Sequence, residues 1–84
     1  MAAFAIVAPL DNVLLPGIIT TKFPKHFALS QGQWVVAEAG LTAQQVAERI
    51  GLNGAAGSFA VFSIAGFNGW YNKTLWEWLT INSG

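Results

Sequence analysis

The residues of this 84-residue chain that could do chemistry gather near its C-terminal end. Trp70, Tyr71 and Lys73 place two aromatic rings and a cation within four residues, and three of the four tryptophans fall between residues 70 and 78. Aromatic rings beside a cation can stack on nucleic-acid bases, and each ring removes a large apolar area from water when it is covered. The segment is therefore expected to close a core, cover a neighbouring subunit or hold a ligand.

Residues suited to acid, base or nucleophilic catalysis are few and scattered. His26 is the only histidine and no cysteine is present, whereas a catalytic histidine needs a nucleophile and an orienting group. The carboxylates come from separate segments without the spacing of a metal site: Asp11, Glu38, Glu48 and Glu77. We expect no catalytic residue, no bound metal and no cofactor, and we interpret His26 as a surface or capping residue. The protein is not expected to be an enzyme.

The glycine series at positions 51, 54 and 57 invites comparison with a phosphate-binding loop. It follows an expected helix and precedes an expected strand, which reverses the order of both phosphate-binding fingerprints. We therefore interpret it as a helix cap followed by a turn. The four cations are dispersed and the net charge is zero with His26 neutral, so the basic footprint of a surface that binds duplex nucleic acid is missing.

Composition predicts one domain over residues 1–84. Hydrophobic residues make up 54% of the chain and charged residues only 10%, whereas about a quarter is usual for a soluble domain. A weakly charged surface favours self-association, so a homo-oligomer is expected. The absence of cysteine fits a cytoplasmic location. Five glycines and three asparagines within residues 50–72 argue against a transmembrane helix and contact with a membrane.

The first half of the chain shows four expected elements. A short apolar run at residues 4–8, ended by Pro9, predicts a buried strand. The next apolar residues share one helical face and predict a helix: Leu15, Ile18, Ile19 and Phe23. Pro24 is expected to end that helix. Residues 26–37 predict two strands around a polar turn, with a single bent strand as the alternative.

The middle of the chain holds the clearest helix signal. Thr42 and Gln45 form a capping box, which predicts a helix beginning there. Gly51 is expected to adopt the left-handed C-terminal cap, with Leu52 folding back onto the helix. Residues 58–65 are rich in strand-forming types and apolar on both faces. We expect helices on one of these faces and a partner subunit on the other.

The aromatic segment is divided by its helical spacing. Asn72 can cap a final helix that extends to Leu79. In such a helix Leu75, Trp76 and Leu79 share a face that belongs in the core, whereas Trp78 lies on a different side and is left for another contact. A strand, in which both tryptophans would share a face, is the alternative for this segment.

The expected order is strand, helix, strand, strand, helix, strand and helix. This is an α+β fold, the ferredoxin-like βαββαβ sandwich with an extra C-terminal helix. The order resembles small Cas2-like and related ferredoxin-like bacterial proteins, which often dimerise through their sheets. In Cas2 nucleases an aspartate closes the first strand, but here Asp11 is displaced by Pro9 and Leu10, so the resemblance implies no metal site. Residues 32–36, 42–46 and 75–78 also resemble uncharacterised small bacterial and phage proteins, which implies no function.

The sequence favours a non-enzymatic protein that self-associates, with the aromatic C-terminal segment and an open sheet face forming subunit or partner contacts. The alternative is a small binding module for a small ligand or single-stranded nucleic acid, which would use the glycine-flanked aromatic loop. The candidate contact residues are Phe67, Trp70, Tyr71, Lys73 and Trp78.

Overall fold

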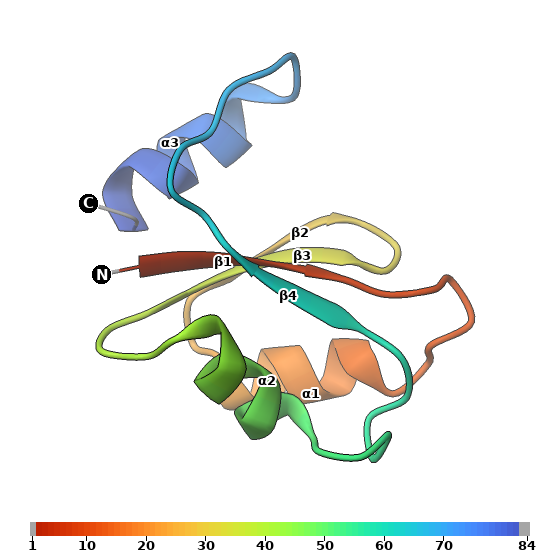
Figure 1. Cartoon of the computed structure of the whole chain (residues 1–84). Coiled ribbons are helices and arrows are strands. Elements are labelled where there is room, and N and C mark those ends of the chain that lie inside the picture. Colours follow the sequence, from red (N-terminus) through yellow and green to blue (C-terminus); the bar gives the residue numbers. More distant parts are fainter. Residues whose placement is uncertain (1, 83–84) are drawn as a thin grey trace.

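A computed structural model describes residues 2–82. The elements are β1 (Ala2–Val7), α1 (Leu15–Lys22), β2 (His26–Ser30), β3 (Gln33–Glu38), α2 (Ala43–Ile50), β4 (Ala60–Ser63) and α3 (Lys73–Asn82). The strands form one four-stranded antiparallel sheet in the order β2-β3-β1-β4. Helices α1 and α2 lie on one face of the sheet and α3 lies on the other (Figure 1). The α+β class and the element order predicted from the sequence are confirmed.

The first of two cores lies between the sheet and the helices α1 and α2. Phe4 and Ile6 of β1 are fully buried in it. The apolar face predicted for α1 is confirmed: Leu15, Ile19 and Phe23 are buried and Ile18 is partly buried. The helix ends at Lys22, just before the proline that was expected to stop it.

Residues 26–37 form a hairpin, so the alternative of one bent strand is wrong. β2 and β3 pair antiparallel, with an irregularity between Ala28 and Ser30. Gly32 in the turn has a φ of +77°, and a Cβ at this position would lie 2.5 Å from the carbonyl oxygen of Ala8. Both the backbone conformation and the close approach of Ala8, just after β1, therefore require glycine here.

The helix α2 begins as predicted but ends differently. The amide of Gln45 donates to Thr42 Oγ1 at 3.2 Å and the amide of Thr42 donates to Gln45 Oε1 at 2.8 Å, which completes the capping box. Gly51 is extended, with a φ of 161°, rather than left-handed, and Leu52 is 57% exposed rather than folded back. The next loop packs closely against this glycine, because a Cβ on Gly51 would lie only 3.1 Å from Ala56 Cβ.

Strand β4 is shorter than the predicted residues 58–65. Its alternation is as expected, since Phe59 and Val61 pack against the first core and Ile64 packs against the second. The strand covers only Ala60–Ser63, two residues fewer than predicted at each end. Gly57, just before the predicted start, has a φ of +80°, a left-handed conformation that keeps the strand from extending further toward the N-terminus.

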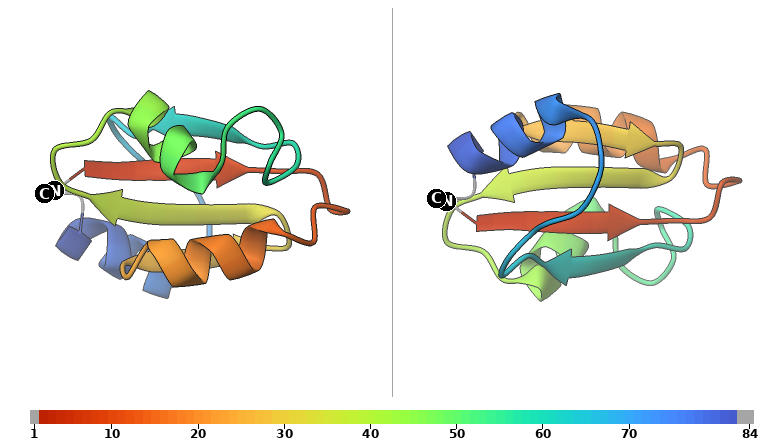
Figure 2. Two further views of the ribbon diagram at one scale, coloured as in Figure 1. Left: turned by 90° about the horizontal axis from the view of Figure 1, so that it is seen from below. Right: turned by 90° about the horizontal axis from the view of Figure 1, so that it is seen from above.

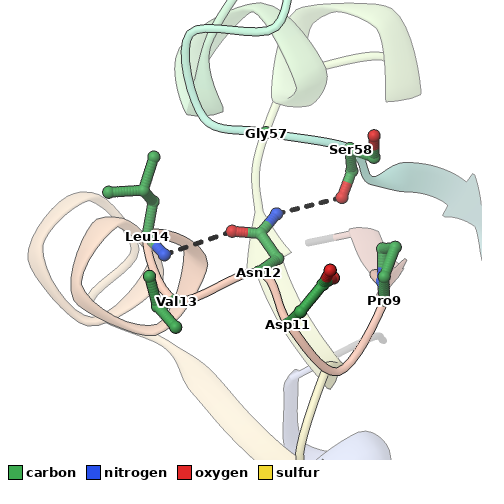
Figure 3. A pocket seen from close by; sticks show the side chains of 7 residues that line it. All are labelled: Pro9, Asp11, Asn12, Val13, Leu14, Gly57 and Ser58. Atoms are coloured by element: carbon green, nitrogen blue, oxygen red, sulfur yellow. Dashed lines mark hydrogen bonds between the residues drawn. The ribbon is translucent and has the colours of Figure 1, made fainter.

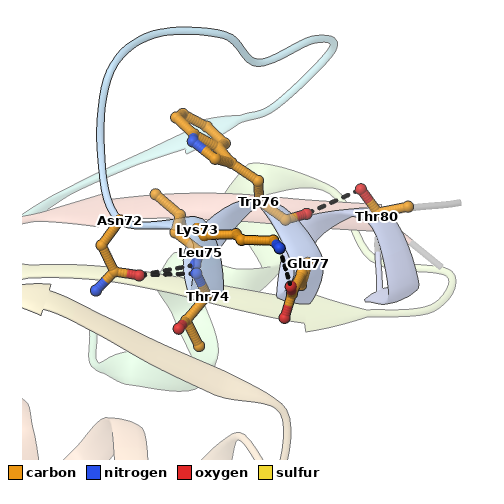
Figure 4. Close-up of polar contacts among 7 residues, drawn as sticks. All are labelled: Asn72, Lys73, Thr74, Leu75, Trp76, Glu77 and Thr80. Carbon is orange, nitrogen blue, oxygen red and sulfur yellow. Dashed lines mark hydrogen bonds and ion pairs between the residues drawn. The ribbon is translucent and has the colours of Figure 1, made fainter.

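The C-terminal segment is a helix, so its strand alternative is wrong. Asn72 Oδ1 accepts the amide of Thr74 at 2.8 Å and that of Leu75 at 3.4 Å, which caps α3 (Figure 4). The second core joins this helix to the other sheet face: Ala3, Val35, Leu75 and Leu79. No helix within residues 2–82 is long and apolar enough to cross a membrane.

Both tryptophans of α3 pack against this second core, contrary to the expectation that only one could. Trp76 stacks on Phe67 with ring centroids 6.1 Å apart and planes at 8°. Trp78 is tilted against Phe27 at 6.1 Å. Successive helical residues are about 100° apart, so the two rings lie on opposite flanks of the stripe that carries Leu75 and Leu79. Trp76 and Trp78 can therefore pack on the two sides of the stripe formed by Leu75 and Leu79.

We expect Leu79→Ala to lower the free energy of unfolding by about 2–5 kcal/mol, because it leaves a cavity between α3 and the sheet. Ile81→Ala is the control on the same helix, since Ile81 is 79% exposed, and its effect should stay within about 0.5 kcal/mol. Urea unfolding followed by circular dichroism measures both. Equal effects of the two changes would contradict the docking of α3 on the sheet.

Candidate functional site

His26 occupies a capping position at the end of α1. Its Nδ1 donates to the carbonyl oxygen of Phe23 at 2.6 Å, and its ring packs edge-on against Trp34 with centroids 6.0 Å apart. Phe23 is the C-terminal cap of α1, where carbonyl groups lack helical partners. These contacts support the interpretation of His26 as a capping residue.

The described residues contain little else that is suited to catalysis. Within residues 2–82 no group of three or more His, Cys, Asp or Glu side chains is placed to hold a metal ion. No polar or charged side chain in this range is buried.

The sheet face that carries α3 is covered unevenly. Figure 2 shows α3 over the β2 side of the sheet and no helix above β4 on this face. Phe62 is 58% exposed and Val7 is 45% exposed. The strand register pairs Ala5 with Phe62 and Val7 with Ala60, which places their four side chains on this same face. We call these four residues the open patch.

The connection from β4 to α3 carries the aromatic loop, which we define as residues 67–71. It lies on the same side of the sheet as the open patch (Figure 1). The Trp70 side chain is fully exposed, with a relative exposure of 101%. Phe67 and Tyr71 are 44% and 45% exposed, respectively. The loop thus presents three rings to solvent to different extents.

Two contacts fix the aromatic loop to the rest of the chain. Phe67 stacks on Trp76, and the hydroxyl group of Tyr71 donates to the carbonyl oxygen of Leu29. Leu29 lies at the irregularity in β2, between the paired residues Ala28 and Ser30. Because both ends of the loop are held, Trp70 is presented from an anchored segment.

The remaining candidate residues lie within α3. Lys73 Nζ is 3.9 Å from Glu77 Oε1, one helical turn away (Figure 4), and both side chains are largely exposed. Such surface pairs contribute little to stability. Trp78 is partly buried against Phe27. The structure therefore brings Trp78 into contact with the sheet, and it turns Lys73 toward a carboxylate of its own helix.

An open hollow of about 350 Å³ adjoins the aromatic loop and is lined by Phe67, Asn68, Gly69 and Trp76. Its walls carry no charged side chain. The stacked pair of rings provides an apolar wall, and the side-chain oxygen of Asn68 accepts the amide of Gly69 at 2.7 Å. A flat aromatic group is the kind of ligand that such a wall can accommodate.

Asn12 is a structural clamp that the sequence analysis did not single out. Its Nδ2 donates to the carbonyl oxygens of Ala56 and Ser58, both at 2.9 Å. Its Oδ1 accepts the amides of Leu14 and Leu15, both at 3.2 Å, at the start of α1. The sequence signal is an asparagine in the loop before the helix, since asparagine side chains often bond to backbone groups two or three residues further on.

The clamp borders a second hollow of about 440 Å³ (Figure 3), lined by Pro9, Asp11, Asn12, Val13, Leu14, Gly57 and Ser58. Val13 and Leu14 are exposed apolar residues at its rim. A Cβ on Gly57 would lie 3.0 Å from Asn12 Nδ2, so this glycine lets the two loops approach. The side-chain oxygen and nitrogen of Asn12 both bond to backbone groups of the chain. We therefore interpret the hollow as the place where two loops are held together.

Comparisons with protein-family models, with curated proteins and with solved structures found no match to this chain.

Asn12→Asp should lower the free energy of unfolding by about 1–3 kcal/mol. The carboxylate keeps an acceptor for the amides of α1 but loses the donor to Ala56 and Ser58, whose carbonyl oxygens then face a negative charge. Asn68→Asp introduces the same charge, but the side chain of Asn68 acts there as an acceptor, so its effect should be within about 0.5 kcal/mol. Chemical denaturation distinguishes the two variants, and an unaffected Asn12→Asp protein would argue against the clamp.

Proposed function

We propose that this chain is a non-enzymatic interaction protein that self-associates through the open patch and the aromatic loop. The proposal rests above all on Phe62, which is 58% exposed on a sheet face that a helix covers only in part. Covering a large apolar side chain contributes about 1.5–3 kcal/mol. Contiguous apolar surface of this kind typically marks an interaction site.

The distribution of charge favours a second copy as the partner. The chain has four cations and four carboxylates, and none of them falls within residues 50–72. This stretch contains β4 and the aromatic loop, so two copies can approach there without opposing like charges. The centres of protein interfaces are depleted in charged residues and enriched in aromatic ones, and the open patch and the aromatic loop share that composition.

We assign the fold to the ferredoxin-like class. The strand order β2-β3-β1-β4, the antiparallel pairing and the two helices on one face all support the assignment. The six-element arrangement leaves the other sheet face without helices. In this chain α3 covers the β2 side of that face, and the open patch is the part that is left.

A second candidate function is the binding of a planar ligand or of single-stranded nucleic acid by the aromatic loop. It is favoured by one observation, the complete exposure of Trp70 on a loop that is held by its neighbours. Stacking of a base on an aromatic side chain contributes about 1–3 kcal/mol. The pairing of Lys73 with Glu77 reduces the positive charge available to a phosphate backbone. For this reason we rank ligand or nucleic-acid binding behind self-association.

Phe62→Ser should weaken self-association by at least about tenfold, which corresponds to about 1.4 kcal/mol, because it removes the largest side chain of the open patch. Ile81→Ser is the matched control, since Ile81 is 79% exposed on α3 and lies outside the patch. Light scattering coupled to gel filtration over a range of concentrations measures the assembly of all three proteins. A wild-type protein that stays monomeric throughout would refute the proposed function.

The second function predicts that Trp70→Ala weakens binding of a labelled oligothymidine by about 5- to 150-fold, the range that corresponds to 1–3 kcal/mol of stacking. Trp70→Phe keeps an aromatic face and should retain part of the affinity. Fluorescence anisotropy at low salt measures binding, and Trp34→Phe serves as a control for loss of a tryptophan on the opposite sheet face. Undetectable binding by the wild-type protein would eliminate the nucleic-acid form of this function.

A further inference from the structure

The two edges of the sheet differ in their protection against strand addition. The β2 edge has an irregularity between Ala28 and Ser30, and the carbonyl group of Leu29 accepts the hydroxyl of Tyr71. Irregularities and covered polar groups are devices that keep an edge from pairing with another chain. The β4 edge has a regular register with β1 and the uncharged sequence AVFS, without lysine or proline. Figure 2 shows β4 as the outermost strand on its side of the sheet.

The hydrogen-bond alternation identifies the backbone groups that β4 turns outward. The amide of Ile64 donates to the carbonyl oxygen of Ala3 at 3.0 Å, in continuation of the β1–β4 register. In an antiparallel ladder every second residue exchanges hydrogen bonds with the same neighbour. The even-numbered residues of β4 therefore bond to β1, whereas Val61 and Ser63 direct their N–H and C=O groups away from the sheet.

We propose that two copies of the chain join by antiparallel pairing of their β4 edges, which rests on the self-association proposed above. Along the outer edge of β4, the N–H and C=O groups of Val61 and Ser63 provide alternating hydrogen-bond donors and acceptors. A two-fold axis between two such edges places donors opposite acceptors in both directions. The pairing extends the four-stranded sheet of each copy into one continuous sheet of the dimer.

The side chains of β4, like its backbone groups, allow a second copy to pair with it. Like charges on directly opposite residues destabilise paired strands, and β4 contains no charge to oppose its own copy. Phe62 lies on the edge strand and belongs to the open patch. Pairing of the edges therefore places Phe62 of each copy at the seam and joins the two open patches into one apolar surface.

Ser63→Pro tests the pairing. Ser63 is exposed and its N–H points outward, so proline removes a donor that the sheet of one copy does not use; proline is tolerated on edge strands for this reason. Ser63→Ala removes the same hydroxyl group but keeps the N–H. We expect Ser63→Pro to weaken self-association by at least tenfold and Ser63→Ala to assemble as the wild type does, with unchanged circular dichroism for both.

Amide hydrogen exchange of the wild-type protein gives a second measurement that does not depend on the folding of a variant. We expect the amides of Val61 and Ser63 to become protected as the concentration rises into the range in which the protein assembles. The amide of Ile64, which bonds to β1 within each copy, is the internal reference and should be protected at every concentration.

The outcomes separate this inference from the proposed function. If the protein assembles but the Val61 and Ser63 amides exchange equally fast at all concentrations, edge pairing is overturned while self-association through the open patch stands. Assembly of Ser63→Pro at wild-type strength has the same meaning. A monomeric wild-type protein overturns both proposals. Protection of these amides only after another protein is added would overturn the second copy as the occupant of the edge.

Discussion

The position of β1 between two cores is the constraint on which the rest of the structure depends. Phe4 and Ile6 fill the core under α1 and α2, while Ala3 lies in the core under α3. Large side chains on one face and small ones on the other make the two sides unequal. The face of β1 with the large side chains packs against two helices, and the face with alanines packs against one.

One helix cannot cover a sheet face of four strands, so the contacts of α3 decide which part is left uncovered. Trp78 packs on Phe27 and the hydroxyl of Tyr71 bonds to Leu29, and both partners belong to β2. These contacts hold α3 and the loop that precedes it over the β2 side of the sheet. They also protect the β2 edge. The β4 side keeps an exposed Phe62 and an unprotected edge. The candidate contact surface is thus a direct consequence of where α3 docks.

Local signals in the sequence were sufficient for most of the fold. The capping box at Thr42 and the cap at Asn72 involve partners within three residues, so both helix starts were predicted correctly. The left-handed cap expected at Gly51 is wrong, and the structure packs Ala56 of the following loop closely against this glycine. Asn12 was missed because the carbonyl groups it binds lie more than forty residues away. Features fixed by distant partners cannot be deduced from spacing in one sequence.

The aromatic loop shows the same limit in the candidate site. Its composition predicted contact residues, but only tertiary contacts distinguish their roles. Phe67 and Tyr71 are held by Trp76 and by the backbone of β2, respectively, whereas Trp70 between them is fully exposed. Because Phe67 and Tyr71 are held in place, the backbone around Trp70 has less conformational freedom to lose when a partner binds. Such preorganisation strengthens binding. An exposed indole on an anchored loop is therefore better suited to contact a partner than the same residue on a free chain.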